Sequence, residues 1–250
     1  MVEEYFRYYV GWAGKVCGQV LPSSGNKFSF TKREPVGVYV QIIPCNFPLL
    51  MAAFKLAPAL AMGNTVVLKL AEQTPLTALC LGELAVKAGY PDGVLNIVPG
   101  FGPTVGARLV LHDDVNKVAF TGSTIVSHQI MRMAADSNLK RESLELGGKS
   151  PIIVRADADL DAAAEVAPEG VYVNAGQVCT ASLRIFVHEK VHDAFVAKLK
   201  ALAESRHIGP GDDPANNHGP LVSVRQHERV LAYIEKGKGE GATVVTGGCR

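Results

Sequence analysis

The sequence predicts an α/β protein whose main part is a doubly wound parallel sheet, followed by a second α/β segment. After Pro35, short β-branched apolar runs alternate with helical stretches, and the connections between them are short. Strands that are apolar along most of their length are typical of a parallel sheet covered by helices on both faces. The chain has 250 residues, of which 48% are hydrophobic and 20% are charged, so it can build the core that this fold class needs.

Two elements precede the sheet. Residues 4–16 carry apolar and aromatic side chains on one side of a predicted helix. Two alternating runs then flank the turn signal Ser23-Ser24-Gly25-Asn26, so residues 17–34 are expected to form a small β-hairpin.

Four strands of the sheet are predicted from the apolar runs, and each leads into a helix. The strands are expected at 36–43, 65–70, 94–98 and 117–122, and the helices at about 48–63, 75–88 and 105–111, with a last one ending near 135. Right-handed crossovers would place these helices on both faces of the sheet. This pattern favours a Rossmann-like, dinucleotide-type architecture.

A second segment begins near residue 150. Strands are predicted at 150–154, 183–188 and 242–248, and helices at 159–173, 191–205 and 223–236. We therefore expect four parts: an N-terminal helix (1–16), the hairpin (17–34), a dinucleotide-binding domain (35–147) and a further domain (148–250).

Composition excludes several classes of function. A net charge of +1 gives no reason to expect a nucleic acid or an anionic membrane as a partner. The most apolar stretch, 48–63, contains Lys55 and Pro58 and is too short to span a bilayer. The five cysteines form neither a CxxC pair nor a zinc-ligand pattern, so no metal is expected, and reduced thiols favour a soluble, cytoplasmic protein.

Ligands of doubly wound sheets bind beyond the carboxyl ends of the strands, so the residues there are the candidate ligands. Lys69 ends the second strand, and Glu72 opens the turn that follows it. The two can form a solvated charge pair, or they can hydrogen-bond the vicinal hydroxyls of an adenosine ribose. In the second interpretation the carboxylate would also repel a 2′-phosphate and favour NAD over NADP.

Glycines follow the third and fourth strands. Gly100, Gly102 and Gly106 allow a close backbone approach ahead of a helix, although they do not complete the GxGxxG fingerprint. Gly122 and Ser123 open the next helix, whose first N–H groups can hold a phosphate or simply be capped by the serine.

Three further residues are candidates for catalysis. Asn46 lies in a turn between two prolines. It is either an oxyanion-hole donor or an ordinary turn-former or helix cap. Glu145 lies in an apolar run. Burial there would raise its pKa and let it act as a general base; the alternative is a buried glutamate that is paired for structural reasons. Cys179 lies in the stretch NAGQVCTAS. Its thiol can fill space in the core, form a disulfide or act as a nucleophile.

Taken in order, these stretches resemble the NAD(P)-dependent aldehyde dehydrogenase superfamily over almost all of the chain. The motifs that carry the resemblance are EPVGVYVQIIPCNFPLLMAAFKLAPALAMGNTVVLK, EQTPLTAL, GFGPTVG, FTGST, LELGGKSP and NAGQVCTAS. Members of this family are longer, so the chain is similar to their central portion, and the second domain is expected to be an incomplete catalytic domain.

The resemblance implies oxidation of an aldehyde to a carboxylic acid with NAD, with NADP as a possible cofactor. Cys179 is the implied nucleophile that forms a thiohemiacetal and then a thioester. Asn46 and the backbone N–H of Cys179 are the implied oxyanion donors, and Glu145 is the implied base for the hydrolytic water. The hairpin corresponds to the oligomerisation arm of the family, so a homo-oligomer is expected.

The resemblance also implies the residues that contact the cofactor. They are Ile43, Pro44, Cys45, Lys69, Glu72, Gly102, Gly106, Phe120, Gly122, Ser123, Val126, Leu146 and Gly147.

The chain departs from the family pattern at several places. Cys45 stands where the family usually has tryptophan, Pro168 and Glu169 fall in an expected apolar helix, and Ile125-Val126-Ser127 replace a Glu-Val/Ile-Gly sequence. The later family motif EIFGP is not in these residues. The alternative function is therefore an inactive homologue that serves as a nucleotide-binding or interaction subunit.

Overall fold

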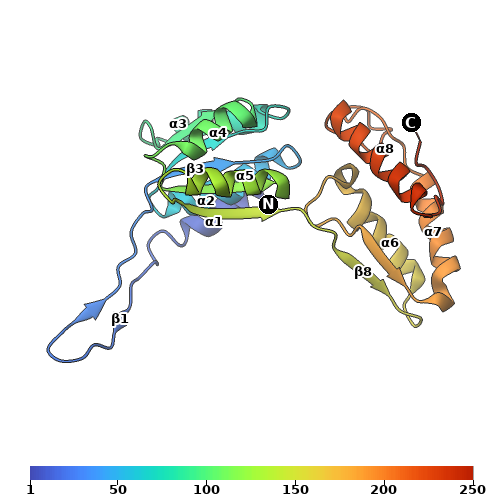
Figure 1. Ribbon diagram of the computed structural model, residues 1–250, viewed down its shortest axis with the longest axis horizontal. Coiled ribbons are helices and arrows are strands. Elements are labelled where there is room, and N and C mark those ends of the chain that lie inside the picture. Colours follow the sequence, from blue (N-terminus) through green and yellow to red (C-terminus); the bar gives the residue numbers. More distant parts are fainter. Residues whose placement is uncertain (250) are drawn as a thin grey trace. The chain divides into compact units, whose positions relative to one another are not determined.

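The computed structural model describes residues 1–249 and divides into two compact units, Met1–Leu146 and Gly147–Arg250 (Figure 1). Each unit buries its own apolar side chains: two clusters lie in the first unit and one lies in the second.

The first unit is a doubly wound α/β domain, as the sequence predicts. The five strands of its main sheet are all parallel and lie in the order β5-β4-β3-β6-β7. Their bounds are β3 (Val38–Ile42), β4 (Thr65–Lys69), β5 (Leu95–Val98), β6 (Lys117–Gly122) and β7 (Arg141–Leu146). The chain builds outward from β3 to β5, then returns to the other side of β3 with β6. The topological switch point therefore lies between β3 and β6, where open α/β sheets bind their ligands.

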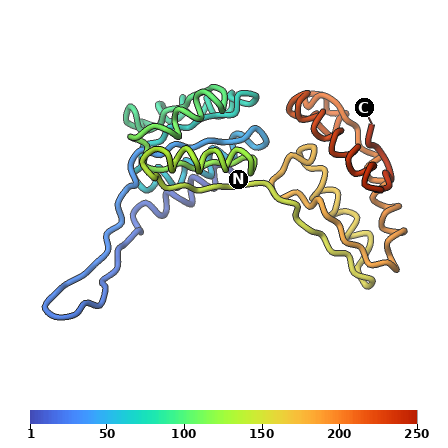
Figure 2. Tube along the Cα trace, viewed as in Figure 1, coloured from blue at the N-terminus to red at the C-terminus, as the bar shows by residue number. Residues whose placement is uncertain are grey.

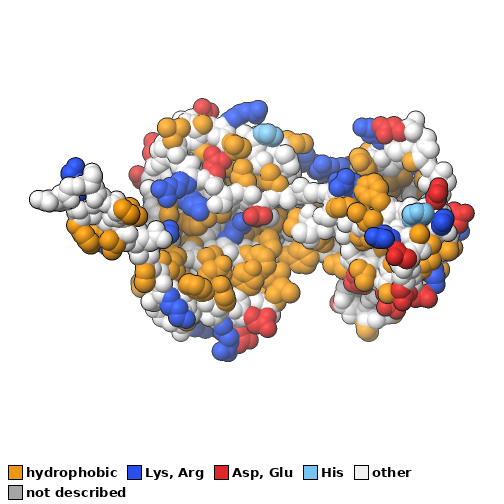
Figure 3. Space-filling view, turned by 90° about the horizontal axis from the view of Figure 1, so that it is seen from below, with side chains coloured by type: hydrophobic (Ala, Val, Ile, Leu, Met, Phe, Trp, Pro, Cys, Tyr) orange, Lys and Arg blue, Asp and Glu red, His pale blue; other side chains and the backbone are white. Residues whose placement is uncertain are grey.

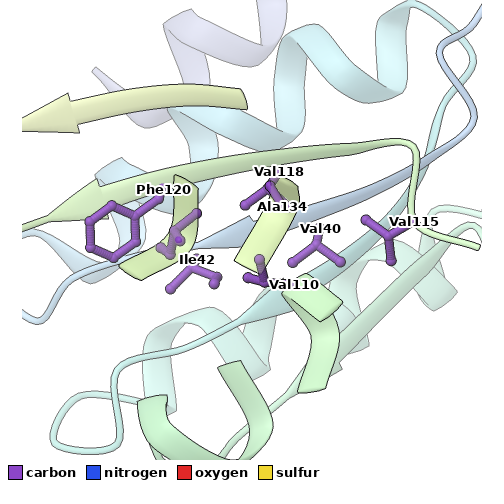
Figure 4. Close-up of a cluster of buried hydrophobic side chains, with 8 residues drawn as sticks. Val40, Ile42, Val110, Val115, Val118, Phe120 and Ala134 are labelled. Atoms are coloured by element: carbon purple, nitrogen blue, oxygen red, sulfur yellow. The ribbon is translucent and has the colours of Figure 1, made fainter. Parts of the chain in front are cut away.

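Helices cover both faces of this sheet. One face packs against α2 (Pro48–Ala61) and α3 (Leu76–Lys87), with α1 (Val2–Val10) against α2. The other face packs against α5 (Thr124–Ala135) and α4 (Ala107–Leu111), which continues from a short π-helical turn, Gly102–Gly106. Figure 4 shows this second core, in which Val40 and Ile42 of β3 meet Val110 of α4.

The fifth strand, β7, is a structural element that the sequence does not predict. It pairs with β6 over its whole length, from Lys117 opposite Arg141 to Gly122 opposite Leu146. It forms one edge of the sheet, and its residues alternate between exposed and half-buried, with charged side chains at Arg141, Glu142 and Glu145. The apolar runs that indicate buried parallel strands are therefore missing from it.

The predicted hairpin is confirmed, although its paired strands are short. Strand β1 (Val20–Leu21) pairs antiparallel with β2 (Ser29–Phe30), and the segment forms the extended blue arm in Figure 2. The predicted N-terminal helix begins earlier and ends sooner than expected, because α1 stops at Val10 and residues 11–15 form turns. Gly11 and Gly14 in this stretch disfavour a longer helix.

The second unit has a small parallel sheet and three helices. Strand β8 (Pro151–Val154) pairs with β9 (Arg184–Val187). The helices are α6 (Leu160–Tyr172), α7 (His192–Glu204) and α8 (Val224–Gly239), with short 3₁₀ turns at Val173–Gly176 and Glu189–Val191. Phe195 of α7 is fully buried and packs with Ala164 and Ala167 of α6 and Val154 of β8.

The predicted strand at 242–248 is wrong, since residues 242–249 contain no strand. The described residues provide it with no partner strand, and Val244 and Val245 are exposed. A strand forms only where a neighbour satisfies its backbone groups, which the local sequence does not reveal.

Pro168 lies inside α6 and is buried, and the helix continues past it to Tyr172.

Among the described residues, no helix is both long and apolar enough to cross a membrane.

Candidate nucleotide site and cysteine loop

A cavity of about 800 Å³ opens at the switch point of the first unit. Its walls come from the carboxyl ends of β3, β4 and β6 and from the facing sides of α4 and α5. Four core side chains, those of Ile42, Val110, Phe120 and Ile130, also line this cavity, and the first three are labelled in Figure 4. The volume falls within the usual range for a small-molecule site. We call this space the switch-point cavity.

The switch-point cavity brings together most of the residues that the family resemblance assigns to the cofactor. These residues are Ile43, Pro44, Cys45, Lys69, Glu72, Gly102, Gly106, Phe120, Gly122, Ser123 and Val126. Leu146 and Gly147 are not among the lining residues, because Leu146 ends the edge strand and Gly147 begins the second unit.

Lys69 and Glu72 form an ion pair on one wall of the cavity. The lysine Nζ lies 3.4 Å from Oε2 of Glu72, and the lysine side chain is 5% exposed while the glutamate is 35% exposed. The predicted charge pair is therefore present, but its lysine is buried and not solvated as the first interpretation expects. A buried ammonium beside a half-exposed carboxylate presents a donor and an acceptor together, as two neighbouring hydroxyl groups require.

Glycines keep another part of the cavity open. A Cβ atom at Gly102 or at Gly106 would meet no atom within 4 Å, so a side chain there would extend into free space. Both glycines belong to the π-helical turn that leads into α4. Their lack of side chains lets a ligand approach the backbone closely.

The N-terminus of α5 lies at the same end of the cavity as Lys69. Ser123 is its N-cap, and the serine Oγ accepts a hydrogen bond from the N–H of Val126 at 3.4 Å. The capping interpretation of Ser123 is thus present in the structure. The first N–H groups of a helix have no partner within it, which makes this end suitable for an anion.

One side of α5 forms a wall that the sequence predicts only at its first residue. Gln129, Ile130 and Met133 line the cavity together with Val126, at the spacing of successive helical turns. Extending the helical period from Val126 would have identified them. The other lining residues not predicted are Ile42, Ala71, Gln73, Pro103, Ala107, Val110, Thr121 and Arg132.

Cys45 lines the cavity in a half-buried position. Burial raises the pKa of its thiol; a backbone hydrogen bond partly opposes the shift, and the negative charge of Glu72 adds to it. The neutral thiol is therefore favoured, and Cys45 is a poor nucleophile compared with a thiolate.

Asn46 follows Cys45 and does not line the cavity. Its side-chain oxygen accepts a hydrogen bond from the N–H of Phe47 at 3.0 Å, directly before α2 begins. This bond directs the oxygen of the amide toward the backbone at the start of the helix.

Glu145 lies on β7 and is exposed, so the burial that was expected to raise its pKa is not found in the described residues. Its charge acts instead on Lys55 of α2. Burial lowers the pKa of Lys55 to about 8; Glu145 opposes this shift, while the positive charge of Lys117 adds to it.

Cys179 belongs to the second unit and is exposed, and it lies on a loop, residues 173–182, which we call the cysteine loop. No cysteine is in a disulfide among residues 1–249. The side chain of Gln177 holds this loop at two points. Its Oε1 accepts a hydrogen bond from the N–H of Val222 at 3.1 Å, and its Nε2 donates to the carbonyl of Asn174 at 3.1 Å.

Three residues shortly before Cys179 have left-handed backbone conformations, with positive φ. Asn174, Ala175 and Gly176 have φ values of 52°, 55° and 72°. Beyond the cysteine, the N–H of Ser182 donates to the carbonyl of Gly170 at 2.7 Å. Gly148, from the LELGGKSP motif, lies beside the loop, since a Cβ there would be 3.7 Å from the carbonyl oxygen of Cys179.

Comparison with known proteins gives a consistent result over the whole chain. The model of the aldehyde dehydrogenase family matches residues 1–250. The chain is 67% identical to the mitochondrial aldehyde dehydrogenase of Leishmania tarentolae over 245 residues, which cover 98% of this chain and 49% of that protein. It is 54% identical to the human mitochondrial aldehyde dehydrogenase over 248 residues, or 99% of this chain and 48% of that protein.

Solved structures give the same picture. An NAD⁺ complex of aldehyde dehydrogenase from Bacillus cereus is 51% identical, has a TM-score of 0.96, and is matched over 100% of this chain and 50% of its own. A complex of PnpE with nicotinamide adenine dinucleotide is 43% identical with a TM-score of 0.95, over 99% of this chain and 50% of its own. The chain thus spans about half the length of the relatives that it matches. It belongs to the aldehyde dehydrogenase family.

Proposed function

We propose that the protein binds NAD in the switch-point cavity and oxidises an aldehyde to a carboxylic acid through Cys179. The observation that carries the cofactor assignment is the buried Lys69 beside Glu72, at the carboxyl end of β4 and within a glycine-lined cavity. These groups suit the adenosine ribose, and the charge of Glu72 disfavours a 2′-phosphate, so NAD is preferred to NADP. The relatives described as NAD complexes support the same assignment.

The other parts of the cavity suit the rest of a dinucleotide. The N-terminus of α5, at Ser123, would take the pyrophosphate through its backbone N–H groups. The space between α4 and the wall formed by Val126, Ile130 and Met133 is mostly apolar and would take the adenine ring.

The chemistry is assigned to three residues of this chain. The thiolate of Cys179 adds to the aldehyde carbon, a C–S bond forms, and the carbonyl electron pair moves to the oxygen. The side-chain amide of Asn46 and the backbone N–H of Cys179 stabilise the resulting oxyanion. NAD, when bound, supplies the acceptor for the hydride that leaves this carbon.

Hydrolysis then completes the reaction. The oxidised carbon is a thioester of Cys179, and Glu145 takes a proton from the water that attacks it. The C–S bond breaks, the thiolate is regenerated and the carboxylic acid leaves. The exposed position of Glu145 suits this role in one respect, because water reaches its carboxylate directly.

Substitution of the proposed nucleophile tests this assignment. Cys179→Ser should abolish aldehyde-dependent formation of NADH, because a serine hydroxyl at its ordinary pKa is a far weaker nucleophile than a thiolate. It should leave binding of NAD unchanged, measured as the rise in melting temperature that a ligand of the native state produces.

Cys80→Ser, at an exposed cysteine of α3, is the matched control and should retain activity. Turnover that survives in Cys179→Ser would show that another residue attacks the aldehyde.

We also propose that the hairpin, residues 17–34, mediates a homo-oligomer. Phe28 and Phe30 of this arm are 75% and 62% exposed, and Figure 3 shows hydrophobic side chains along the arm. Short paired strands with free edges and exposed phenylalanines suit pairing with another subunit.

A cytoplasmic location remains a proposal, supported by the five unpaired cysteines. Several relatives are named mitochondrial, and fractionation of cells that produce the protein would distinguish the two compartments.

A further inference from the structure

The wall of the switch-point cavity on α5 contains two polar side chains among apolar ones: Gln129, which can both donate and accept a hydrogen bond, and Arg132, which can only donate. Val126, Ile130 and Met133 are hydrophobic, and Gln129 lies between them at the same helical spacing. Any flat aromatic ring can pack against these apolar side chains, so such packing does not distinguish one base from another. An amide on such a wall can supply that distinction, because it carries both a donor and an acceptor.

Gln129 is available for such a contact. It is exposed toward solvent, and its side chain makes no hydrogen bond or ion pair within residues 1–249. By contrast, the charged residues Lys69 and Glu72, at the carboxyl end of β4, already bond to each other. A ligand in the cavity would therefore meet an amide that has its full hydrogen-bonding capacity.

The position of Gln129 along α5 fits the base of a nucleotide. Ser123 is the N-cap, six positions earlier, so Gln129 lies about 9 Å further along the helix axis at the usual rise per residue. A phosphate at the N-terminus of α5 would place the sugar and base of the same nucleotide along the helix toward Gln129. The opposite side of this space is formed by Gly106, Ala107 and Val110, which carry no polar side-chain group.

We propose that Gln129 is a specificity-determining residue that recognises the adenine base of the dinucleotide. Its side-chain oxygen accepts a hydrogen bond from the N6 amino group, and its NH₂ group donates to N7. Glutamine pairs with adenine through these two atoms in protein–DNA complexes, which shows that the geometry is accessible. This inference rests on the proposed NAD site.

The test compares NAD with its hypoxanthine analogue, in which an oxygen replaces the N6 amino group. In the analogue the glutamine oxygen faces another acceptor, so one of the two hydrogen bonds is lost. We expect the unchanged protein to bind NAD about 5- to 20-fold more tightly than the analogue, measured as two dissociation constants by calorimetry. This is the lower part of the range for such a pair, because Gln129 is exposed.

Gln129→Leu should reduce the ratio of the two dissociation constants to within about twofold, because leucine keeps the apolar contact and removes both hydrogen bonds. The ratio is measured within one protein preparation, so a change in the folded fraction cancels. His128→Leu is the matched control: it is the neighbouring exposed residue of α5, does not line the cavity, and should keep the original ratio.

Two results would overturn the inference while leaving the NAD site intact. One is equal affinity of the unchanged protein for NAD and the analogue; the other is a Gln129→Leu variant that keeps the original ratio. If the unchanged protein bound neither dinucleotide, the proposed function itself would fail, and the inference would fail with it.

Discussion

At the residue scale, the backbone at Ala175 is held in a conformation that alanine disfavours. Its φ is 55°, and the flanking Asn174 and Gly176 have similar values. Asparagine and glycine tolerate this region of φ, whereas alanine places its Cβ too close to the following carbonyl. The cysteine loop is therefore maintained by the bonds around it, including that between Gln177 and Val222.

Ala175→Gly should raise the free energy of unfolding by about 0.5–1 kcal/mol, since glycine removes a cost of about 1–2 kcal/mol and adds some flexibility to the unfolded chain. Urea unfolding measures this change. Ala181→Gly is the matched control in the same loop, at a buried position that is not among the positive-φ residues, and should lower stability by about 0.5–1 kcal/mol. A loss of stability in Ala175→Gly would mean that the alanine is not strained.

Lys55 makes stability depend on pH. Burial lowers its pKa in the folded protein from 10.5 to about 8, although Glu145 partly opposes the shift. Below pH 8 the lysine is charged in both states, and the folded state carries the cost of burial. Between pH 8 and 10.5 the unfolded chain keeps the proton while the folded chain has lost it, so stability rises with pH.

Lys55→Met should therefore raise the free energy of unfolding at pH 7 by about 2 kcal/mol and remove this rise above pH 8. Chemical denaturation at a series of pH values measures both effects. Lys87→Met, at the exposed end of α3, should change stability at pH 7 by less than about 0.5 kcal/mol. If Lys55→Met were no more stable than the unchanged protein, burial of the charge would not be costly.

At the scale of elements, α6 carries a proline in its interior, where the helix loses a hydrogen bond but gains the packing of a buried ring. Pro168 has no N–H to donate to the carbonyl of Ala164, and an interior proline costs about 3 kcal/mol. The ring is buried, so its removal costs about 1–1.5 kcal/mol of apolar contact. The first effect is larger.

Pro168→Ala should accordingly raise the free energy of unfolding by about 1–2 kcal/mol, measured as a higher denaturant midpoint at unchanged slope. Glu165→Ala, at an exposed position of the same helix, should shift it by less than about 0.5 kcal/mol. A lower midpoint for Pro168→Ala would show that the packing of the proline ring dominates.

The elements also show how far the sequence predicts this fold. Strands β3, β4, β5 and β6 are apolar along their length, so their pattern and the residues at their carboxyl ends were predictable. Strand β7 was not, because Arg141, Glu142 and Glu145 interrupt its apolar residues and obscure the pattern. The apolar run at 242–248 was misleading for the opposite reason, since no partner strand is present in the described residues.

The residues of the candidate site also divide into those that the sequence predicts and those that it does not. The cavity residues that succeed a strand, such as Lys69 and Ser123, could be predicted because parallel strands share one carboxyl edge. Residues contributed by the side of a helix, such as Gln129 and Met133, do not follow a strand and are found only when the helical period is extended from Val126. The exposure of Glu145 depends on its place at the sheet edge.

At the scale of the whole molecule, self-association should depend on the arm formed by residues 17–34. The double substitution Phe28→Ser with Phe30→Ser removes its two most exposed aromatic rings and should shift the protein to a smaller assembly, measured by light scattering during gel filtration. Lys27→Ser, on the same arm, should leave the mass unchanged. An unchanged mass in the double variant would assign the interface to another surface.

The hydrogen bond between Gln177 and Val222 has a consequence for synthesis of the chain. The two residues are 45 positions apart, and a ribosome adds about 5–20 residues per second, so Val222 follows Gln177 by roughly 2–9 s. All five strands of the parallel sheet in the first unit are complete at residue 146. The cysteine loop, in contrast, lacks this bond until translation has passed Val222. The nascent chain is therefore the stage at which the backbone around Cys179 is held least firmly.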